Sequence, residues 1–143
     1  MIRAALLACL MASPAIACDE YVFHVGSYHT DTDLIGSEVE NESNLGFGCR
    51  IAGYEFGAYK NSYSDDSVYA VRDWGFDNGL GVFAGLASGY HNDAAAPSHG
   101  VIPIGGIAYR GQHMTLRASP TYAEDTGDIG AVLSLSLTFG GQQ

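Results

Sequence analysis

The sequence predicts an all-β protein, an eight-stranded antiparallel up-and-down barrel whose strands cross a membrane. Hydrophobic residues make up 47% of the chain and 19 residues are glycine. Beyond the first 17 residues, however, no segment has the ~18 consecutive apolar residues of a membrane helix. Eight runs of strand character follow one another, and short turns alternate with longer polar loops. These features together are typical of a β-barrel in an outer membrane.

The first 17 residues are predicted to be a secretory signal peptide. Arg3 supplies its positive charge, Ala4 to Met11 form a short apolar run, and Ala15-Ile16-Ala17 is a small-x-small cleavage site. Export through this signal leaves residues 18–143 as a single barrel domain, predicted to lie in the cell outer membrane.

Two cysteines remain in the exported domain, Cys18 and Cys49. An oxidising compartment allows them to form one disulfide. Free thiols, or lipidation of Cys18 as the first residue after cleavage, are the alternatives that the spacing leaves open.

The eight predicted strands have lengths close to the ~9–11 residues that a tilted membrane strand needs. The last is the clearest, because Leu133, Leu135 and Leu137 alternate with serines and so define one apolar and one polar face. No segment keeps a 3.6-residue period. The predicted strands are Tyr21–His29, Asn44–Ile51, Tyr54–Lys60, Ser67–Gly75, Leu80–Tyr90, Gly100–Tyr109, His113–Thr121 and Gly130–Phe139.

The connections also alternate in length. Tight turns are predicted at Ala52-Gly53, at Asp77-Asn78-Gly79 and at Arg110-Gly111-Gln112, of which Asn78-Gly79 is the strongest hairpin signal. Longer polar loops at the opposite rim are typical of outer-membrane barrels. A soluble lipocalin-like barrel would share the strand count but should turn polar side chains outward, unlike the leucine face of the last strand. Aromatic residues near the predicted strand ends are assigned to interfacial girdles: Tyr21, Tyr28, Tyr54, Tyr90, Tyr109 and Trp74.

The charge balance constrains the partners. Of the six Lys and Arg residues Arg3 lies in the signal, so five remain beside 16 acids, a net charge of −11. Nucleic acid is therefore excluded as an expected partner, because binding phosphates needs a basic face. The acids of the long loops show no fixed metal-ligand spacing, so we predict a solvated rim, no metal and no cofactor.

His24 and Ser62 are the residues most suited to chemistry. A serine hydroxyl is a poor nucleophile unless a neighbouring base takes its proton, and histidine is the base suited to neutral pH. In an up-and-down barrel, the strand with His24 and the loop with Ser62 open toward the same rim. His29 is the alternative base if His24 lies too deep. If no histidine lies close to Ser62, His24 is simply a polar residue of the barrel lumen and Ser62 a hydroxyl of a loop, without a catalytic role.

Several short segments resemble the lipid A palmitoyltransferase family in strand order. They are Phe23-His24, Lys60-Asn61-Ser62, Trp74 and the run from Leu80 to Gly85. The resemblance implies an eight-stranded outer-membrane barrel that moves an acyl chain from a phospholipid to lipid A. It also implies catalytic roles for His24 and Ser62 near the outer rim.

Two positions depart from the family pattern. Asn61 stands where the family has aspartate, and an amide can orient an imidazole but cannot stabilise its positive charge. Asn61 is therefore predicted to orient His24 in the catalytic site, with the approach of Asp65 or Asp66, or feeble catalysis, as the alternatives. Asp73 precedes Trp74 where the family has the glycine floor of its acyl pocket. A carboxylate at the bottom of an apolar cavity is costly unless it is paired.

Two prolines suggest a lateral opening. With the turn centred between Gly111 and Gln112, Pro103 faces Pro120, and neither can donate a backbone N–H across the seam. The resemblance implies that such a seam admits lipid.

The expected function is therefore transfer of a fatty acyl chain from a glycerophospholipid to lipid A or a related lipid, by a monomer whose partners are membrane lipids. Two alternatives remain: a non-catalytic outer-membrane barrel with a structural or surface-binding role, and a soluble barrel that binds an apolar ligand.

Overall fold

The computed structural model describes residues 18–30, 41–76, 78–90, 100–122 and 129–140. The predicted signal peptide and most of the predicted long-loop acids lie outside the described residues. Within them, no helix is long and apolar enough to cross a membrane.

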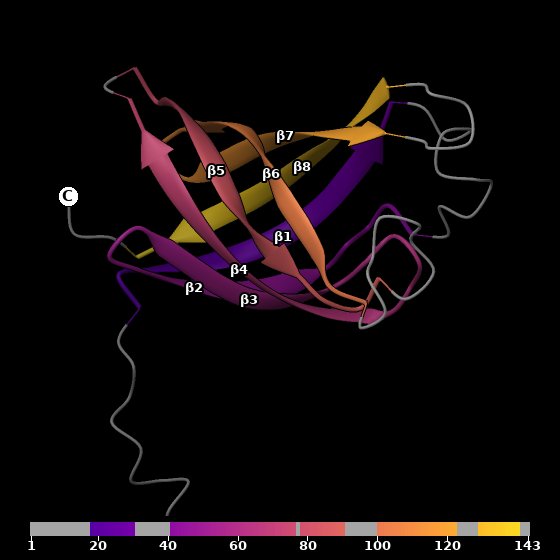
Figure 1. Ribbon diagram of the computed structural model, residues 1–143. Coiled ribbons are helices and arrows are strands. Elements are labelled where there is room, and N and C mark those ends of the chain that lie inside the picture. The colour runs from indigo at the N-terminus through magenta and orange to yellow at the C-terminus, as the bar shows by residue number, and fades with distance from the viewer. Residues whose placement is uncertain (1–17, 31–40, 77, 91–99, 123–128, 141–143) are drawn as a thin grey trace, which may run out of the picture.

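The predicted barrel is confirmed. Each strand pairs antiparallel with its sequence neighbours, and β8 closes onto β1 (Figure 1). Observed and predicted bounds agree closely, except that β5 stops at Ala87 instead of Tyr90. The strands are β1 (Glu20–His29), β2 (Gly46–Ile51), β3 (Tyr54–Lys60), β4 (Asp66–Gly75), β5 (Leu80–Ala87), β6 (Ile102–Arg110), β7 (Met114–Tyr122) and β8 (Ile129–Phe139).

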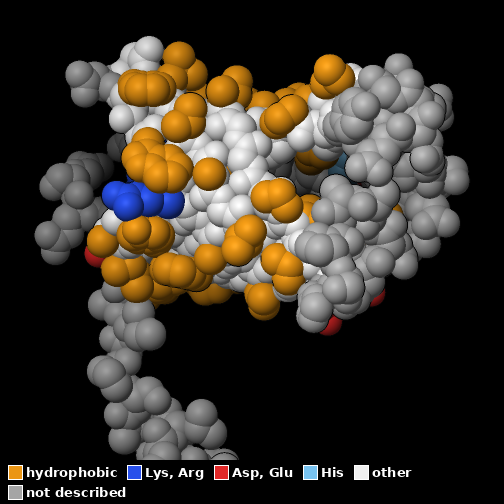
Figure 2. Space-filling view, viewed as in Figure 1, with side chains coloured by type: hydrophobic (Ala, Val, Ile, Leu, Met, Phe, Trp, Pro, Cys, Tyr) orange, Lys and Arg blue, Asp and Glu red, His pale blue; other side chains and the backbone are white. Residues whose placement is uncertain are grey.

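Side chains along each strand point alternately into the barrel and onto its outer wall. In β4, Ser67, Tyr69 and Val71 are buried inside the barrel, whereas Val68 and Ala70 between them are exposed on the wall. A period of two residues places every second side chain on the same face. Hydrophobic side chains therefore spread over the outer wall (Figure 2). Large exposed hydrophobic residues of the strands include Phe23, Phe47, Phe56, Val68, Leu80, Val82, Leu86, Ile107 and Leu116.

The barrel interior contains both an apolar cluster and a charged one. Tyr69, Val71 and Phe83 are the large buried side chains of the apolar cluster. Toward the turn end, Arg50, Glu55 and Arg117 are at most 7% exposed and form ion pairs with one another. Charge inside and apolar surface outside is the reverse of a soluble protein, and it is the arrangement of barrels that face lipid.

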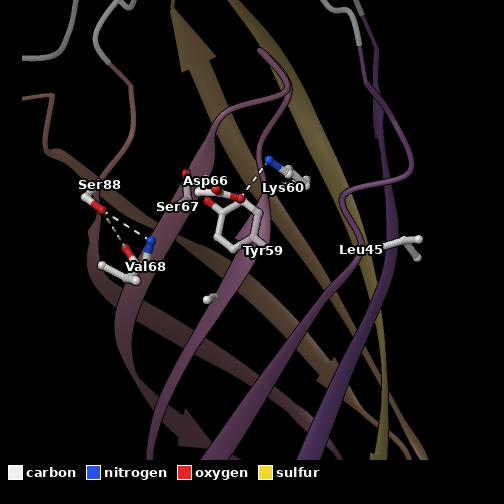
Figure 3. A pocket seen from close by; sticks show the side chains of 8 residues that line it. Leu45, Tyr59, Lys60, Asp66, Ser67, Val68 and Ser88 are labelled. Carbon is white, nitrogen blue, oxygen red and sulfur yellow. Dashed lines mark hydrogen bonds and ion pairs between the residues drawn. The ribbon is translucent and has the colours of Figure 1, made fainter.

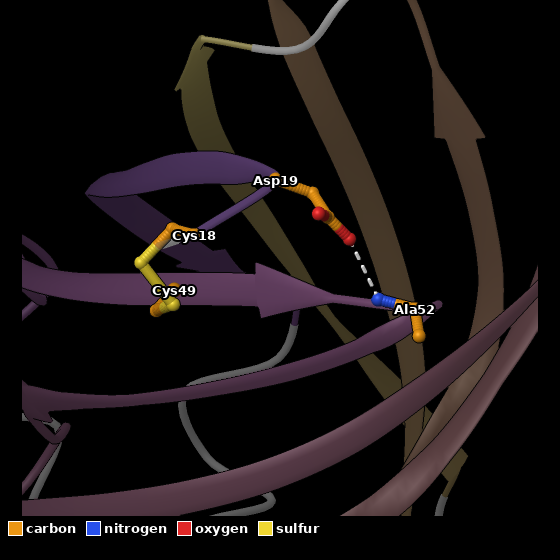
Figure 4. The surroundings of a disulfide bond; sticks show 4 residues. All are labelled: Cys18, Asp19, Cys49 and Ala52. Atoms are coloured by element: carbon orange, nitrogen blue, oxygen red, sulfur yellow. Dashed lines mark hydrogen bonds between the residues drawn. A yellow bond between two sulfur atoms is a disulfide. The ribbon is translucent and has the colours of Figure 1, made fainter. Parts of the chain in front are cut away.

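Of the open possibilities for the cysteines, the structure adopts the disulfide. Cys18 and Cys49 are joined with their Cα atoms 5.3 Å apart, which links the start of the domain to β2 (Figure 4). Beside it, the Asp19 side chain accepts a hydrogen bond of 2.7 Å from the backbone N–H of Ala52. The sulfur of Cys18 is therefore not free for a lipid anchor in this structure.

Most of the predicted girdle tyrosines lie on the outside. Tyr21, Tyr28, Tyr54 and Tyr109 are each more than 40% exposed. Tyr90 differs, because it follows the end of β5 and turns inward, where its hydroxyl lies 2.6 Å from that of Tyr59. The girdle assignment was therefore wrong for Tyr90, which does not face outward.

Candidate functional site

A serine and a histidine meet at the barrel rim that carries the longer loops. Ser62 lies in the connection between β3 and β4, and His29 is the last residue of β1. The Ser62 Oγ lies 3.1 Å from His29 Nε2. The two residues are only 8% and 5% exposed. A buried hydroxyl in hydrogen-bond contact with an imidazole is the minimal arrangement of a base-activated nucleophile.

The predicted partner of Ser62 was wrong. His24 lies in the middle of the barrel, where its Nε2 is 2.7 Å from the Tyr69 hydroxyl and its Nδ1 is 2.9 Å from the Ser136 hydroxyl. Both of its ring nitrogens are therefore used within the lumen. His24 is too deep to meet Ser62, and the alternative base, His29, takes its place.

A β-bulge explains why two histidines five residues apart both point inward. In a regular strand, residues 24 and 29 would face opposite sides of the sheet. The pairing of β1 with β8 shifts between His24 and Gly26, which inserts one extra residue at Val25 and reverses the alternation after it. Both histidines follow an aromatic residue, Phe23 or Tyr28, so the aromatic-His signal alone could not choose between them.

Asn61 builds the loop and does not orient a histidine. Its Oδ1 accepts hydrogen bonds from the backbone N–H groups of Tyr63 (3.0 Å) and Asp65 (2.9 Å). Its Nδ2 donates to the Gly89 carbonyl at 2.8 Å. The side chain is fully buried, and an Asn that closes a turn on its own backbone is a recurrent local motif. Asn61 thus fixes the backbone from which Ser62 projects, and the predicted orienting role is corrected.

The His29 ring has one unused position. Its Nδ1 is buried and has no hydrogen-bond partner in the described part of the chain. Among the described residues, the site therefore has a nucleophile and a base, but no third group that bonds to the imidazole.

The predicted register of the two prolines was also wrong. Strands β6 and β7 pair from Ile107–Ala118 to Arg110–Thr115, two residues away from the register that would oppose Pro103 and Pro120. The pairing ends at Ile107, so the halves of both strands nearer the loop rim share no ladder pair within the described residues. Pro103 instead lies opposite Leu86 of β5, and Pro120 opposite Ala131 of β8. The ladder between β6 and β7 is therefore interrupted toward the loop rim, but the two prolines do not face each other there.

Asp73 is mostly buried, with its side chain 13% exposed, and it is paired. Arg117 Nη2 donates to both of its oxygens, at 3.0 and 2.9 Å, and Arg50 lies 3.5 Å away. The same two arginines hold Glu55, which is fully buried. Asp73 therefore belongs to a charged cluster and not to the floor of an apolar pocket.

Sequence reasoning missed Arg50, Glu55 and Arg117. The available signal was the presence of charged residues within segments already predicted as strands. These three residues face inward, where each is paired with an opposite charge, as charged groups inside an apolar wall require.

A shallow pocket of about 290 Å³ lies next to the Ser62 loop. Leu45, Ala58 and Val68 contribute its apolar lining, and Lys60 and Asp66 form an ion pair of 2.7 Å beside them (Figure 3). The Ser88 hydroxyl lies at the same rim, near the backbone of Val68. The pocket combines apolar and polar groups from both sides of the Ser62 loop, from the end of β3 and the start of β4.

Comparison of the chain with protein-family models, with curated proteins and with solved structures finds no match.

Proposed function

We propose that the protein is an outer-membrane acyltransferase that acts on lipid esters at its loop rim. The observation that carries the proposal is the 3.1 Å contact between Ser62 Oγ and His29 Nε2. The apolar outer wall supports placing this pair at the level of lipid headgroups, where the ester bonds of a phospholipid lie. The donor is a glycerophospholipid, and the acceptor is lipid A or a related hydroxyl-bearing lipid.

In the proposed reaction, His29 Nε2 removes the proton from Ser62 Oγ as the oxygen attacks the ester carbonyl carbon. A bond forms between Oγ and that carbon, and the bond from carbon to the glycerol oxygen breaks. The proton passes from His29 to the departing glycerol oxygen. An acceptor hydroxyl then reverses these steps, giving its proton to His29 and releasing Ser62.

The contents of the barrel restrict where an acyl chain can lie. Arg50, Glu55 and Arg117 occupy the turn half of the interior, so the chain cannot extend to the turn end. The loop half contains the apolar side chains of Ala87, Ile102 and Ile104. The segments of β6 and β7 that do not pair with each other lie in the same half and support lateral entry there.

Lipid A mass spectrometry tests the transferase. A bacterial host that lacks acyl transfer to lipid A should gain a species heavier by one acyl chain when it makes the wild-type protein. Ser62→Ala should give no such species, because the nucleophile is lost. Ser88→Ala removes another hydroxyl at the same rim and should behave as the wild type. A well-folded wild-type protein that leaves lipid A unchanged would contradict the proposal.

A second candidate is a membrane barrel without catalysis, favoured by the packed interior. Tyr69, Val71, Phe83 and the charged cluster fill the barrel with mutually bonded side chains, as a structural barrel requires. For either candidate, we expect the protein to need detergent for extraction. Its migration in SDS gels should change on boiling, because a closed ladder resists SDS until heated. A freely soluble protein with unchanged migration would count against both.

A further inference from the structure

Arg72 lies on the outer wall of the barrel, held against two aromatic rings. Its guanidinium carbon is 4.9 Å from the centre of the Tyr54 ring and 5.5 Å from that of Trp74. Its Nη1 donates a hydrogen bond of 2.8 Å to the Tyr54 hydroxyl. The side chain is exposed, so the rings orient the cation without covering it.

Among the Lys and Arg residues in the described part of the chain, Arg72 is the one for which no ion pair with a carboxylate is found. Each of the others makes an ion pair: Arg50 with Glu20 and Glu55, Lys60 with Asp66, Arg110 with Glu20, and Arg117 with Glu55 and Asp73. A guanidinium has five N–H donors, and the contact with Tyr54 uses only one.

The position of this cation indicates the kind of anion that it can meet. Arg72 pairs with Tyr54 of β3 and Ala84 of β5 near the turn end of the wall. Basic side chains gather among hydrophobic ones at this end (Figure 2). In an outer-membrane barrel the turn end faces the periplasm, where the leaflet consists of glycerophospholipids. Aromatic belts lie at the level of their headgroups.

We propose that Arg72, with Tyr54 and Trp74, forms a binding site for the phosphate of a glycerophospholipid headgroup. The guanidinium donates to the phosphate oxygens, and the two rings contact the upper part of the acyl chains. The site rests on the membrane-spanning part of the proposed function and not on acyl transfer. It lies at the opposite end of the barrel from Ser62.

Trp74 provides the measurement, because it is the only tryptophan of the chain. The folded protein in maltoside micelles is titrated with short-chain phosphatidylglycerol while Trp74 emission is recorded. We expect a saturable change for the wild type. Arg72→Gln should weaken the apparent affinity by about tenfold, in line with the loss of a charge-assisted hydrogen bond. The matching short-chain diacylglycerol, which lacks phosphate, should give no saturable change.

Arg110→Gln is the matched control, because Arg110 is an exposed arginine near the same end but is paired with Glu20. It should bind as the wild type. Inorganic phosphate should not reproduce the response, which separates a lipid site from a site for free phosphate. Equal binding by Arg72→Gln and wild type, an equal loss in Arg110→Gln, or an equal response to inorganic phosphate would each overturn the proposal.

Gel migration with and without boiling shows for every variant that the barrel is folded, and vesicle insertion shows that it spans a bilayer. A wild type that does not insert would remove the basis of the site. A wild type that inserts and binds phosphatidylglycerol without modifying lipid A would keep the site while the transferase fails.

Discussion

Replacing His29 by alanine is expected to lower the rate of acyl transfer by about 10²–10⁴-fold, the usual contribution of a positioned general base. The expectation follows from its contact with Ser62, because the hydroxyl would have no group to take its proton. Ser62 and Asn61 do not depend on His29 for their backbone positions, since the loop is closed by the Asn61 side chain. The loss should therefore appear in kcat and not in folding.

His24→Ala provides the contrast. His24 bonds to Tyr69 and Ser136 inside the lumen, and Tyr69 donates its own hydrogen to Glu55 at 2.8 Å. Tyr69 must therefore accept from His24, which leaves the other ring nitrogen to accept from Ser136. Removing this ring should cost about 1–3 kcal/mol of stability through unsatisfied polar groups.

The rate of acyl transfer from a phospholipid donor is measured for His29→Ala and for His24→Ala. Gel migration first shows that both variants are folded. His24→Ala should keep a transfer rate within a few-fold of the wild type. If His24→Ala abolished transfer while His29→Ala preserved it, the base assigned from the structure would be the wrong one.

The strands could be predicted well because two local signals determine them, the alternation of side chains along a strand and the sequence of the turn that follows it. The alternation of Leu133, Leu135 and Leu137 with serines needs only a period of two, and Asn78-Gly79 places a hairpin turn between β4 and β5. Neither signal depends on contacts between distant segments. The bounds of the eight strands consequently agree with the sequence to within a few residues.

The site was harder to predict because it depends on depth and register. One extra residue at the β1 bulge decides which histidine reaches the rim, and nothing in the sequence near Val25 marks it. A shift of two residues between β6 and β7 separates Pro103 from Pro120, although the predicted turn was close. The shift of two residues keeps each side chain on its face but changes its neighbours, whereas the one-residue bulge moves the side chains that follow it to the other face.

The role of Asn61 could not be predicted for a different reason. Its amide could have served either a histidine or its own backbone, since both need a hydrogen-bond acceptor of the same chemistry. The local option prevails because Tyr63 and Asp65 present backbone N–H groups within two and four residues. Asn61 is therefore a turn-forming residue and takes no part in the hydrogen bonding of His29.

Glu55→Gln is expected to destabilise the barrel by about 3–5 kcal/mol, the usual cost of breaking a buried ion pair. Glu55 is fully buried and its two oxygens accept from Arg50 (2.6 Å), from Arg117 (3.0 and 2.9 Å) and from Tyr69. The neutral amide keeps the size of the side chain. It leaves two buried guanidinium groups with less negative charge than they need.

Urea unfolding in lipid vesicles measures this effect, with Asp66→Asn as the control. Asp66 also pairs with a basic residue, Lys60, but the two side chains are 89% and 52% exposed, so its loss should cost less than about 1 kcal/mol. Adding Arg117→Gln to Glu55→Gln removes one of the excess cations. The double variant should therefore be more stable than the sum of the two single losses predicts, because the two residues interact directly. A Glu55→Gln barrel as stable as the Asp66→Asn control would mean that the interior charges do not hold the strands together.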